Sequence, residues 1–224
     1  MSEWWSYSLS DFLLFSPRTY RHLFELYNAE TWPLHLLALA TGGGVCWLLW
    51  RGGALRWRVA ALALAACWGW VGIGFFALRY ASINWAASYL AVAFGVQALL
   101  LVLRAAQPAA AAAVRWDGLA LIAFGLLLQP LIGPLLGRPW SQLEVFGMAP
   151  DPTVTVTLGL LLTAAPGRWN AWPWVIPLLW CAASGATLWA MRDPDAWAMP
   201  LVGAAALSLA AWRSRRHFRH AGRR

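Results

Sequence analysis

Long apolar segments without an internal charged residue are the feature that most limits what this chain can fold into. Six of them are 17 to 21 residues long, and about 20 residues of helix are needed to cross a bilayer. They cover residues 32–50, 59–78, 83–103, 118–136, 171–191 and 196–212. Charged residues make up only 12% of the chain, about half their share in a soluble domain. A water-soluble fold is therefore excluded, and we predict an all-α integral membrane protein.

A seventh apolar segment, residues 153–165, is the fifth in order along the chain and is shorter than the others. It has 13 residues, four of them threonine. It spans the membrane if its helix extends into the flanking residues, and otherwise it is re-entrant. The sequence therefore predicts a bundle of about seven transmembrane helices, or six if the fifth segment is re-entrant.

The distribution of arginine predicts the orientation of this bundle. All 17 basic residues of the chain are arginine. With seven crossings and a cytoplasmic C-terminus, 12 of them lie on the inner side and 5 on the outer side, whereas a re-entrant fifth segment changes these counts to 11 and 6. Because cytoplasmic loops carry the excess of basic residues, we expect the N-terminus on the outer side of the membrane and the C-terminus in the cytoplasm.

Three parts follow from this topology: a surface segment over residues 1–31, a transmembrane domain over 32–212 and a basic cytoplasmic tail over 213–224. The tail holds six arginines and is expected to bind anionic lipid headgroups. The lipid bilayer is the expected partner, and nucleic acid is not.

The segment before the first apolar run is expected to form an amphipathic helix. Ser16-Pro17 is typical of a helix start, because serine caps the first turn and proline fits its first position. Apolar side chains then recur at helical spacing, at Tyr20, Leu23, Phe24 and Tyr27. On the other face, Arg21 and Glu25 are an i,i+4 pair. The apolar stripe is expected to lie on the bilayer surface or on the outer ends of the bundle.

Two groups of residues inside the expected spans are candidates for a cavity. Gln129-Pro130 and then Pro134 are expected to interrupt the fourth helix and free carbonyl groups. Broken helices line cavities in many transporters, and the alternative is a proline kink satisfied by neighbouring helices. The other candidates are Gln97, Trp68, Trp70 and Trp180. A mid-membrane indole N–H needs a partner, so at least one of these tryptophans is expected to face the interior.

A second set of candidates is expected on the outer side, as a polar cluster of His22, Glu25, His35, Asp193 and Asp195. Met148, Met191, Met199, Glu144 and Asp151 fall on the same side, and thioethers with imidazoles suit copper(I). No two of the methionine and histidine residues stand at ligand spacing, so no metal or other cofactor is predicted. No catalytic motif is present, and we do not expect an enzyme.

The segment from Ser8 to Tyr20, SLSDFLLFSPRTY, continuing to ELYN at Glu25–Asn28, resembles the start of an uncharacterised bacterial inner-membrane family. That family is catalogued as a domain of unknown function, and its members are often labelled "permease". The resemblance implies a multi-helix protein of the bacterial inner membrane with an amphipathic N-terminal segment. Together with the arginine distribution, this places the N-terminus in the periplasm and the C-terminus in the cytoplasm. It implies no catalytic or binding residues.

Two functions are compatible with these features. The first is a small-solute permease, suggested by the interrupted fourth helix, the short fifth segment and the mid-membrane tryptophans. The second is a non-catalytic accessory, assembly or sensor subunit that packs against a partner membrane protein, suggested by the scarcity of intramembrane charge. An intramembrane enzyme is the third alternative.

Overall fold

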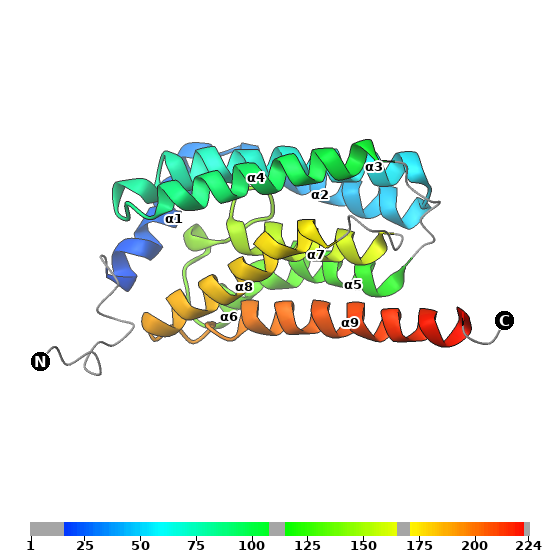
Figure 1. Ribbon diagram of the computed structural model, residues 1–224. Helices are drawn as coiled ribbons and strands as arrows, with labels where there is room; N and C mark the ends of the chain where they lie inside the picture. Colours follow the sequence, from blue (N-terminus) through cyan, green and yellow to red (C-terminus); the bar gives the residue numbers. More distant parts are fainter. Residues whose placement is uncertain (1–15, 108–114, 165–170, 222–224) are drawn as a thin grey trace, which may run out of the picture.

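The computed structural model describes residues 16–107, 115–164 and 171–221, and every regular element within these ranges is helical (Figure 1). Residues 8–15, which carry part of the family resemblance, and residues 222–224 of the expected tail lie outside the described ranges. The elements in chain order are α1 (Pro17–Thr31), α2 (Leu34–Arg51), α3 (Ala54–Trp70), η3 (Val71–Ala77), η4 (Tyr80–Ser82), α4 (Ala87–Ala106), α5 (Trp116–Ala123), η5 (Phe124–Leu128), α6 (Gln129–Leu135), η6 (Trp140–Gln142), α7 (Pro150–Thr163), α8 (Trp172–Ala190) and α9 (Ala198–Ala221).

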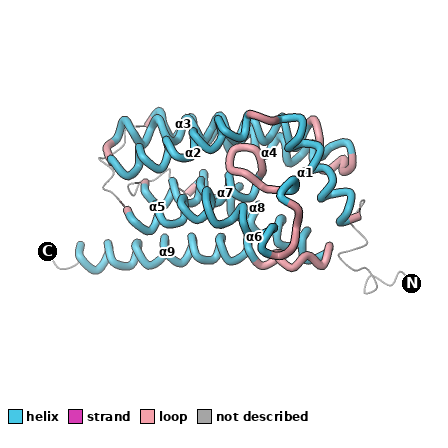
Figure 2. The backbone as a smooth tube through the Cα atoms, turned by 180° about the vertical axis from the view of Figure 1, so that it is seen from behind, coloured by secondary structure: helices cyan, strands magenta, loops and turns pink. Residues whose placement is uncertain are grey.

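The long helices lie side by side along a common direction, with α1 at one end and the end of α9 at the other (Figure 1). These two ends are called the α1 end and the C-terminal end below. α3 packs between α2 and α4, while α7 contacts α5, α8 and α9. Seen from behind, the connection from α6 to α7 forms loops on the α1 side of the molecule (Figure 2).

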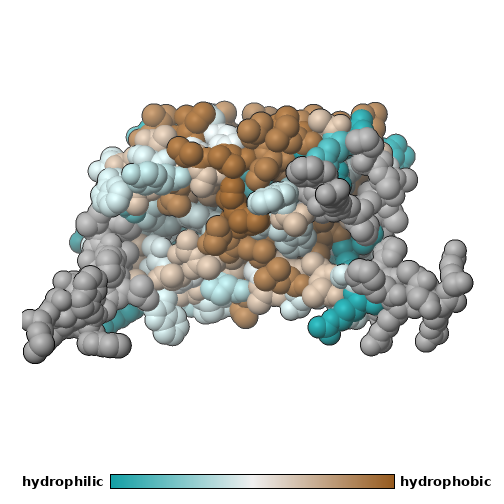
Figure 3. Space-filling model, viewed as in Figure 1, coloured by the Kyte–Doolittle hydropathy of each residue, from teal (hydrophilic) through white to brown (hydrophobic). Residues whose placement is uncertain are grey.

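Five helical segments are long and apolar enough to cross a membrane: Leu34–Arg51, Ala54–Ser82, Ala87–Ala106, Trp116–Leu135 and Trp172–Ala190. Among the described residues, they match five of the six long apolar runs of the sequence, which confirms the prediction of an all-helical fold with several helices apolar enough to span a membrane. On the face in Figure 3, hydrophobic side chains cover much of the middle of the molecule. The last helix, α9, continues past residue 212 to Ala221, so the expected start of the basic tail is not a helix end.

The short fifth segment forms α7, which lies at the centre of the bundle. All 14 residues of α7 are buried, and the buried run begins earlier, at Val145. A helix that is buried on every side takes its partners from the protein rather than from lipid. Glycines permit its close approach to α5, since a Cβ at Gly118 would come within 2.7 Å of the Gly159 carbonyl oxygen. Small residues let membrane helices pack in this way.

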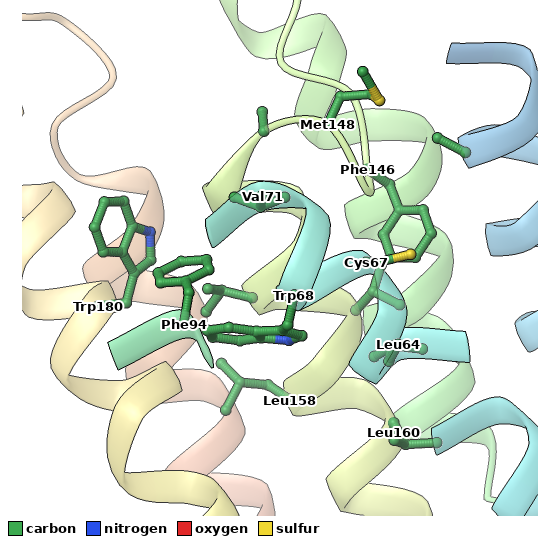
Figure 4. Packing of buried hydrophobic residues seen from close by; sticks show 14 of the residues in the cluster. Leu64, Cys67, Trp68, Val71, Phe94, Phe146, Met148, Leu158, Leu160 and Trp180 are labelled. Atoms are coloured by element: carbon green, nitrogen blue, oxygen red, sulfur yellow. The ribbon is translucent and has the colours of Figure 1, made fainter. Parts of the chain in front are cut away.

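Three tryptophans hold α7 through their indole N–H groups. Trp57 donates to Thr163 Oγ1 at 3.1 Å, Trp68 donates to Thr157 Oγ1 at 2.7 Å, and Trp180 donates to Asp151 Oδ1 at 2.7 Å. Trp68 lies against Phe94, with Trp180 close by (Figure 4). The expectation that at least one mid-membrane tryptophan faces the interior is therefore confirmed.

The third mid-membrane tryptophan, Trp70, has a different environment. It is 40% exposed, and its indole donates to the hydroxyl of Tyr27 on α1 at 3.1 Å. Trp70 therefore faces the outside of the bundle beside α1 and does not line its centre.

The N-terminal helix α1 packs on the bundle through its apolar stripe. Ser16 caps the helix by accepting from Thr19 N at 3.1 Å, and Pro17 occupies its first turn, as the sequence predicts. Leu23, Phe24 and Tyr27 are buried, with the ring centroid of Phe24 lying 4.9 Å from that of Phe75 in η3. Of the two positions expected for the stripe, it takes the one on the end of the bundle.

The expected pairing between Arg21 and Glu25 within α1 is wrong. Arg21 binds Asp193, which follows α8, and Glu25 accepts from Gln142 and contacts His22. Arg21 thus pairs with a residue after α8, and Glu25 pairs with Gln142 of η6 and with His22 one turn away on α1. These contacts replace an exposed i,i+4 pair that contributes only about 0.2–0.5 kcal/mol.

Candidate functional site

A polar pocket lies at the α1 end, beside α6. The fourth apolar segment is helical from Trp116 to Leu135, and α5 passes through the π-helical turn η5 before α6 begins at Gln129. The irregular turn thus lies just before the predicted position, Gln129-Pro130, and both prolines lie within α6. π-helical turns are frequent at functional sites. Gln129 and Pro130 line the pocket, whereas Pro134, inside α6, does not.

The connection between α6 and α7 closes over this pocket. Gly137 has a φ of 88° and ends α6 in a tight turn, a conformation that favours glycine. On α1, Asn28 Nδ2 donates to the carbonyl oxygens of Ser141 at 2.8 Å and Leu143 at 2.9 Å. At the far end of the connection, Gly147 N donates to Thr153 Oγ1 at 2.9 Å. The helix α1 thus fixes the connection against the end of the bundle.

Two arginines pair with carboxylates around the pocket. Arg138 binds Asp195 and also lies 3.5 Å, Nη1 to Oε1, from Glu144. Arg21 binds Asp193. Arg192, with a φ of 56°, ends α8 in the left-handed region, and this turn brings Asp193 back toward α1.

Asp151 lies in the first turn of α7, with both carboxylate oxygens occupied. Oδ1 accepts from Trp180 Nε1 at 2.7 Å, and Oδ2 accepts from Ser184 Oγ at 2.9 Å. Both donors come from α8. These two hydrogen bonds hold the Asp151 carboxyl group at the base of the pocket.

Glu144 is the side chain whose protonation this environment changes most clearly. Burial raises its pKa to about 8, and the negative charge of Asp151 adds to that shift, while Arg138 opposes it. Glu144 is therefore largely protonated at neutral pH. Toward the rim, hydrogen bonds from Gln142 and then His22 lower the pKa of Glu25.

The pocket is small, and its lining carries an excess of acid. Its cavity offers about 20 Å³ to the centre of a water molecule, enough for one water or one ion of that size. Glu144, Asp151 and Asp195 line it together with a single arginine, Arg138. The arrangement suits a small hydrogen-bond donor or a cation better than an anion.

The structure separates the cavity candidates of the sequence into two groups. Gln129 and Pro130 line the pocket, and Trp180 reaches its edge through Asp151. Gln97 is remote from the pocket, because its Nε2 donates to the carbonyl oxygen of Pro173 at the start of α8, at 2.9 Å. Trp68 and Trp70 also lie outside the pocket, because their indole groups donate to Thr157 and Tyr27.

The expected outer polar cluster is also divided. Asp193 and Asp195 belong to the ion pairs around the pocket. His22 and Glu25, 2.8 Å apart from Nδ1 to Oε2, line a neighbouring surface cavity that shares Gln142 with the pocket. His35 is separate, with its Nε2 3.1 Å from Asn28 Oδ1. Within the described ranges, no group of three or more His, Cys, Asp or Glu side chains is placed to hold a metal ion.

Four charged residues of the site, and the uncharged Gln142, were not chosen as site residues from the sequence; the charged ones are Arg21, Arg138, Glu144 and Asp151. All lie outside the apolar segments defined by hydropathy, so they read as ordinary loop or surface charges. The one local signal was Pro150-Asp151-Pro152 directly before a threonine-rich apolar run, a pattern that places an acid in the first turn of a helix.

Comparison with known proteins gives a family for this chain. Residues 18–221 match a family described as "Family of unknown function (DUF6064)". The chain belongs to this family. No curated protein matches the DUF6064 chain, and no solved structure matches it. The family match covers the pocket and nearly all of the bundle, so both are features of the DUF6064 region.

Proposed function

We propose that this DUF6064 chain is a small-solute permease of the bacterial inner membrane and that the polar pocket at the α1 end is its solute-binding site. The observation that carries the proposal is the meeting of α6, which follows the π-helical turn η5, with the first turn of a short buried helix, α7, at a pocket lined by carboxyl groups. Discontinuous helices form the solute and ion sites of many transporters.

The proposed topology has seven crossings, of which α7 is the short one. Fourteen helical residues span about 21 Å, less than the roughly 30 Å of a bilayer core. The buried residues Val145–Ala149 would supply the rest of this crossing. Irregular backbone is tolerated at membrane depth only where protein covers it, and the burial of this stretch meets that condition.

In this topology the α1 end faces the periplasm and the C-terminus lies in the cytoplasm. Reporter fusions at the C-terminus test the orientation: a fluorescent protein that folds in the cytoplasm should be active, and alkaline phosphatase should not. The reverse result would place the pocket on the cytoplasmic face and remove this part of the proposal.

Transport itself is tested with purified protein in liposomes, against a panel of inorganic cations, amines, amino acids, sugars and anions. We expect saturable uptake of at least one solute. Asp195→Asn, which removes a carboxylate from the pocket, should lower that uptake at least tenfold. Asp117→Asn is the matched control, because Asp117 pairs with Arg213 at the C-terminal end, and it should transport like the parent protein.

An accessory or sensor subunit remains the second candidate, and the packing around α7 favours it. In the part of the chain that the structure describes, the side chains on every side of α7 are closely packed, and its polar groups are bonded to α3 and α8. A route through the bundle therefore requires α7 to move. Native mass spectrometry that finds a stoichiometric partner protein, together with no flux for any solute of the panel, would favour this second function.

A further inference from the structure

Three side-chain oxygen atoms of the residues that line the pocket have no hydrogen-bond partner, and their orientation is set by what the rest of each side chain binds. Gln129 is only 9% exposed, and its Nε2 donates to the sulfur of Met199 at 3.2 Å. A thioether accepts but cannot donate, so the amide nitrogen must face the sulfur. The Gln129 carbonyl oxygen, which has no partner, is left for the pocket.

The same reasoning applies to Gln142 at the rim. Its Nε2 donates to Glu25 Oε1 at 2.7 Å, and an ionised carboxylate only accepts. The Oε1 of Gln142 is therefore also left without a partner. On the opposite side, Asp195 accepts from Arg138 through Oδ2, while its Oδ1 has no partner.

The unpaired atoms of the pocket lining are thus mostly acceptors. The one unpaired donor is Arg138 Nε, and it lies against the backbone of Gly133, where a Cβ would come within 2.7 Å of it. Buried acceptors without partners are costly, and three of them around one pocket indicate an occupant that supplies positive charge or several N–H or O–H groups.

We infer that the pocket binds one small monovalent cation, an ammonium or alkali-metal ion, through the free oxygens of Gln129, Gln142 and Asp195. The inference names the ligand class of the proposed permease site and rests on that proposal for its physiological role. The cavity has room for a single ion. A divalent ion would need more carboxylate oxygens at close range, and no suitable group of three acidic, histidine or cysteine side chains exists among the described residues.

Binding is tested on the purified full-length protein in detergent, separately from transport. Thermal unfolding is followed by tryptophan fluorescence while ammonium, sodium or potassium chloride replaces N-methyl-D-glucamine chloride at constant ionic strength. We expect a saturable rise in Tm with at least one of the three cations, because a ligand that binds only the folded state stabilises it. The absence of saturable stabilisation with all three would overturn the inference.

The site is located with variants that remove one oxygen. Gln129→Met should weaken binding of the cation about tenfold to a hundredfold, the expected effect of losing one contact to a charge. Gln97→Met is the matched control: Gln97 is fully buried and also has an unpaired Oε1, but it lies outside the pocket, so its binding should equal that of the parent protein. If Gln129→Met does not fold, Gln142→Met makes the same test at the less buried rim.

Unchanged affinity in a folded Gln129→Met or Gln142→Met variant would refute the assignment of the site. Failure of the cation-site inference can be told apart from failure of the permease proposal. Cation binding without flux in liposomes would support the ion site and overturn the transport function. Flux of another solute without cation binding would support the transport function and overturn the ion site.

Discussion

Replacing Glu144 with glutamine is expected to remove much of the pH dependence of the stability of this protein between about pH 4.5 and pH 8. The ordinary pKa of a glutamic acid is 4.5, and in the fold the pKa of Glu144 is about 8. Below pH 4.5 the group is protonated whether the chain is folded or unfolded. Between the two values only the folded state keeps the proton, so the free energy of unfolding must fall as the pH rises.

The size of this effect follows from the two pKa values. Each unit of difference corresponds to about 1.4 kcal/mol, which gives an upper limit of roughly 5 kcal/mol at pH 8 and above. The side chain is 17% exposed, so water reaches part of it and the effect should be smaller than this limit. A loss of a few kcal/mol corresponds to a fall in Tm of roughly 10 °C for a chain of this length.

The assay is thermal unfolding in detergent from pH 4.5 to 9, followed by tryptophan fluorescence. Glutamine has the shape of the protonated acid and does not ionise, so Glu144→Gln should match the parent protein at pH 5 and be more stable at pH 8.5. Glu30→Gln is the control, because Glu30 is half exposed and pairs with Arg79 on the surface. Equal pH slopes for the parent protein and Glu144→Gln would refute the assignment of a buried, protonated Glu144.

Two further predictions concern the packing of α7. Gly159→Ala should lower stability by about 1–3 kcal/mol, because its Cβ would lie 2.6 Å from Ile122 Cγ1. The control Gly43→Ala, whose Cβ meets no atom within 4 Å, should be neutral or slightly stabilising. Urea or thermal unfolding in detergent compares the two variants, and equal losses of stability would contradict the close approach of α5 and α7. Trp68→Phe should lower the free energy of unfolding by about 1–3 kcal/mol, because it removes a buried hydrogen bond. The control Trp189→Phe, at a 72% exposed position, should lower it less. The reverse order would contradict the role of Trp68 in holding α7.

The helices of this fold could be predicted from the sequence because length and apolarity alone decide which segments cross a membrane. The start of α1 at Ser16-Pro17 was also predictable, since capping and proline chemistry act within a few residues. The irregular turn η5 lies directly before the predicted position, Gln129-Pro130. Burial of the fifth segment on every side could not be predicted from the sequence. Hydropathy gives the same value for an apolar helix facing lipid and one facing other helices, and only the threonines distinguish this segment.

The charged half of the site could not be predicted because its residues come together through a connection that folds back. Arg138 and Glu144 belong to the residues between α6 and α7, and Asp195 to those between α8 and α9. A sequence places such residues on a side of the membrane but gives no distance between them. The same limit explains why Arg21 was paired with its neighbour on α1 rather than with Asp193.

The indole N–H hydrogen bonds of three tryptophans have two effects in this bundle. Each of the three indoles bound to α7 donates to a side-chain oxygen, at Thr163 toward the C-terminal end, at Thr157 in the middle and at Asp151 at the α1 end. The first two acceptors are neutral hydroxyls, and a buried pair of this kind only fixes the helix. The third is a carboxylate beside a pocket, where the same N–H also stabilises a charge. Of the tryptophans that the sequence suggests as cavity lining, Trp68 and Trp180 therefore fasten α7, and only Trp180 also binds an acid that lines the pocket.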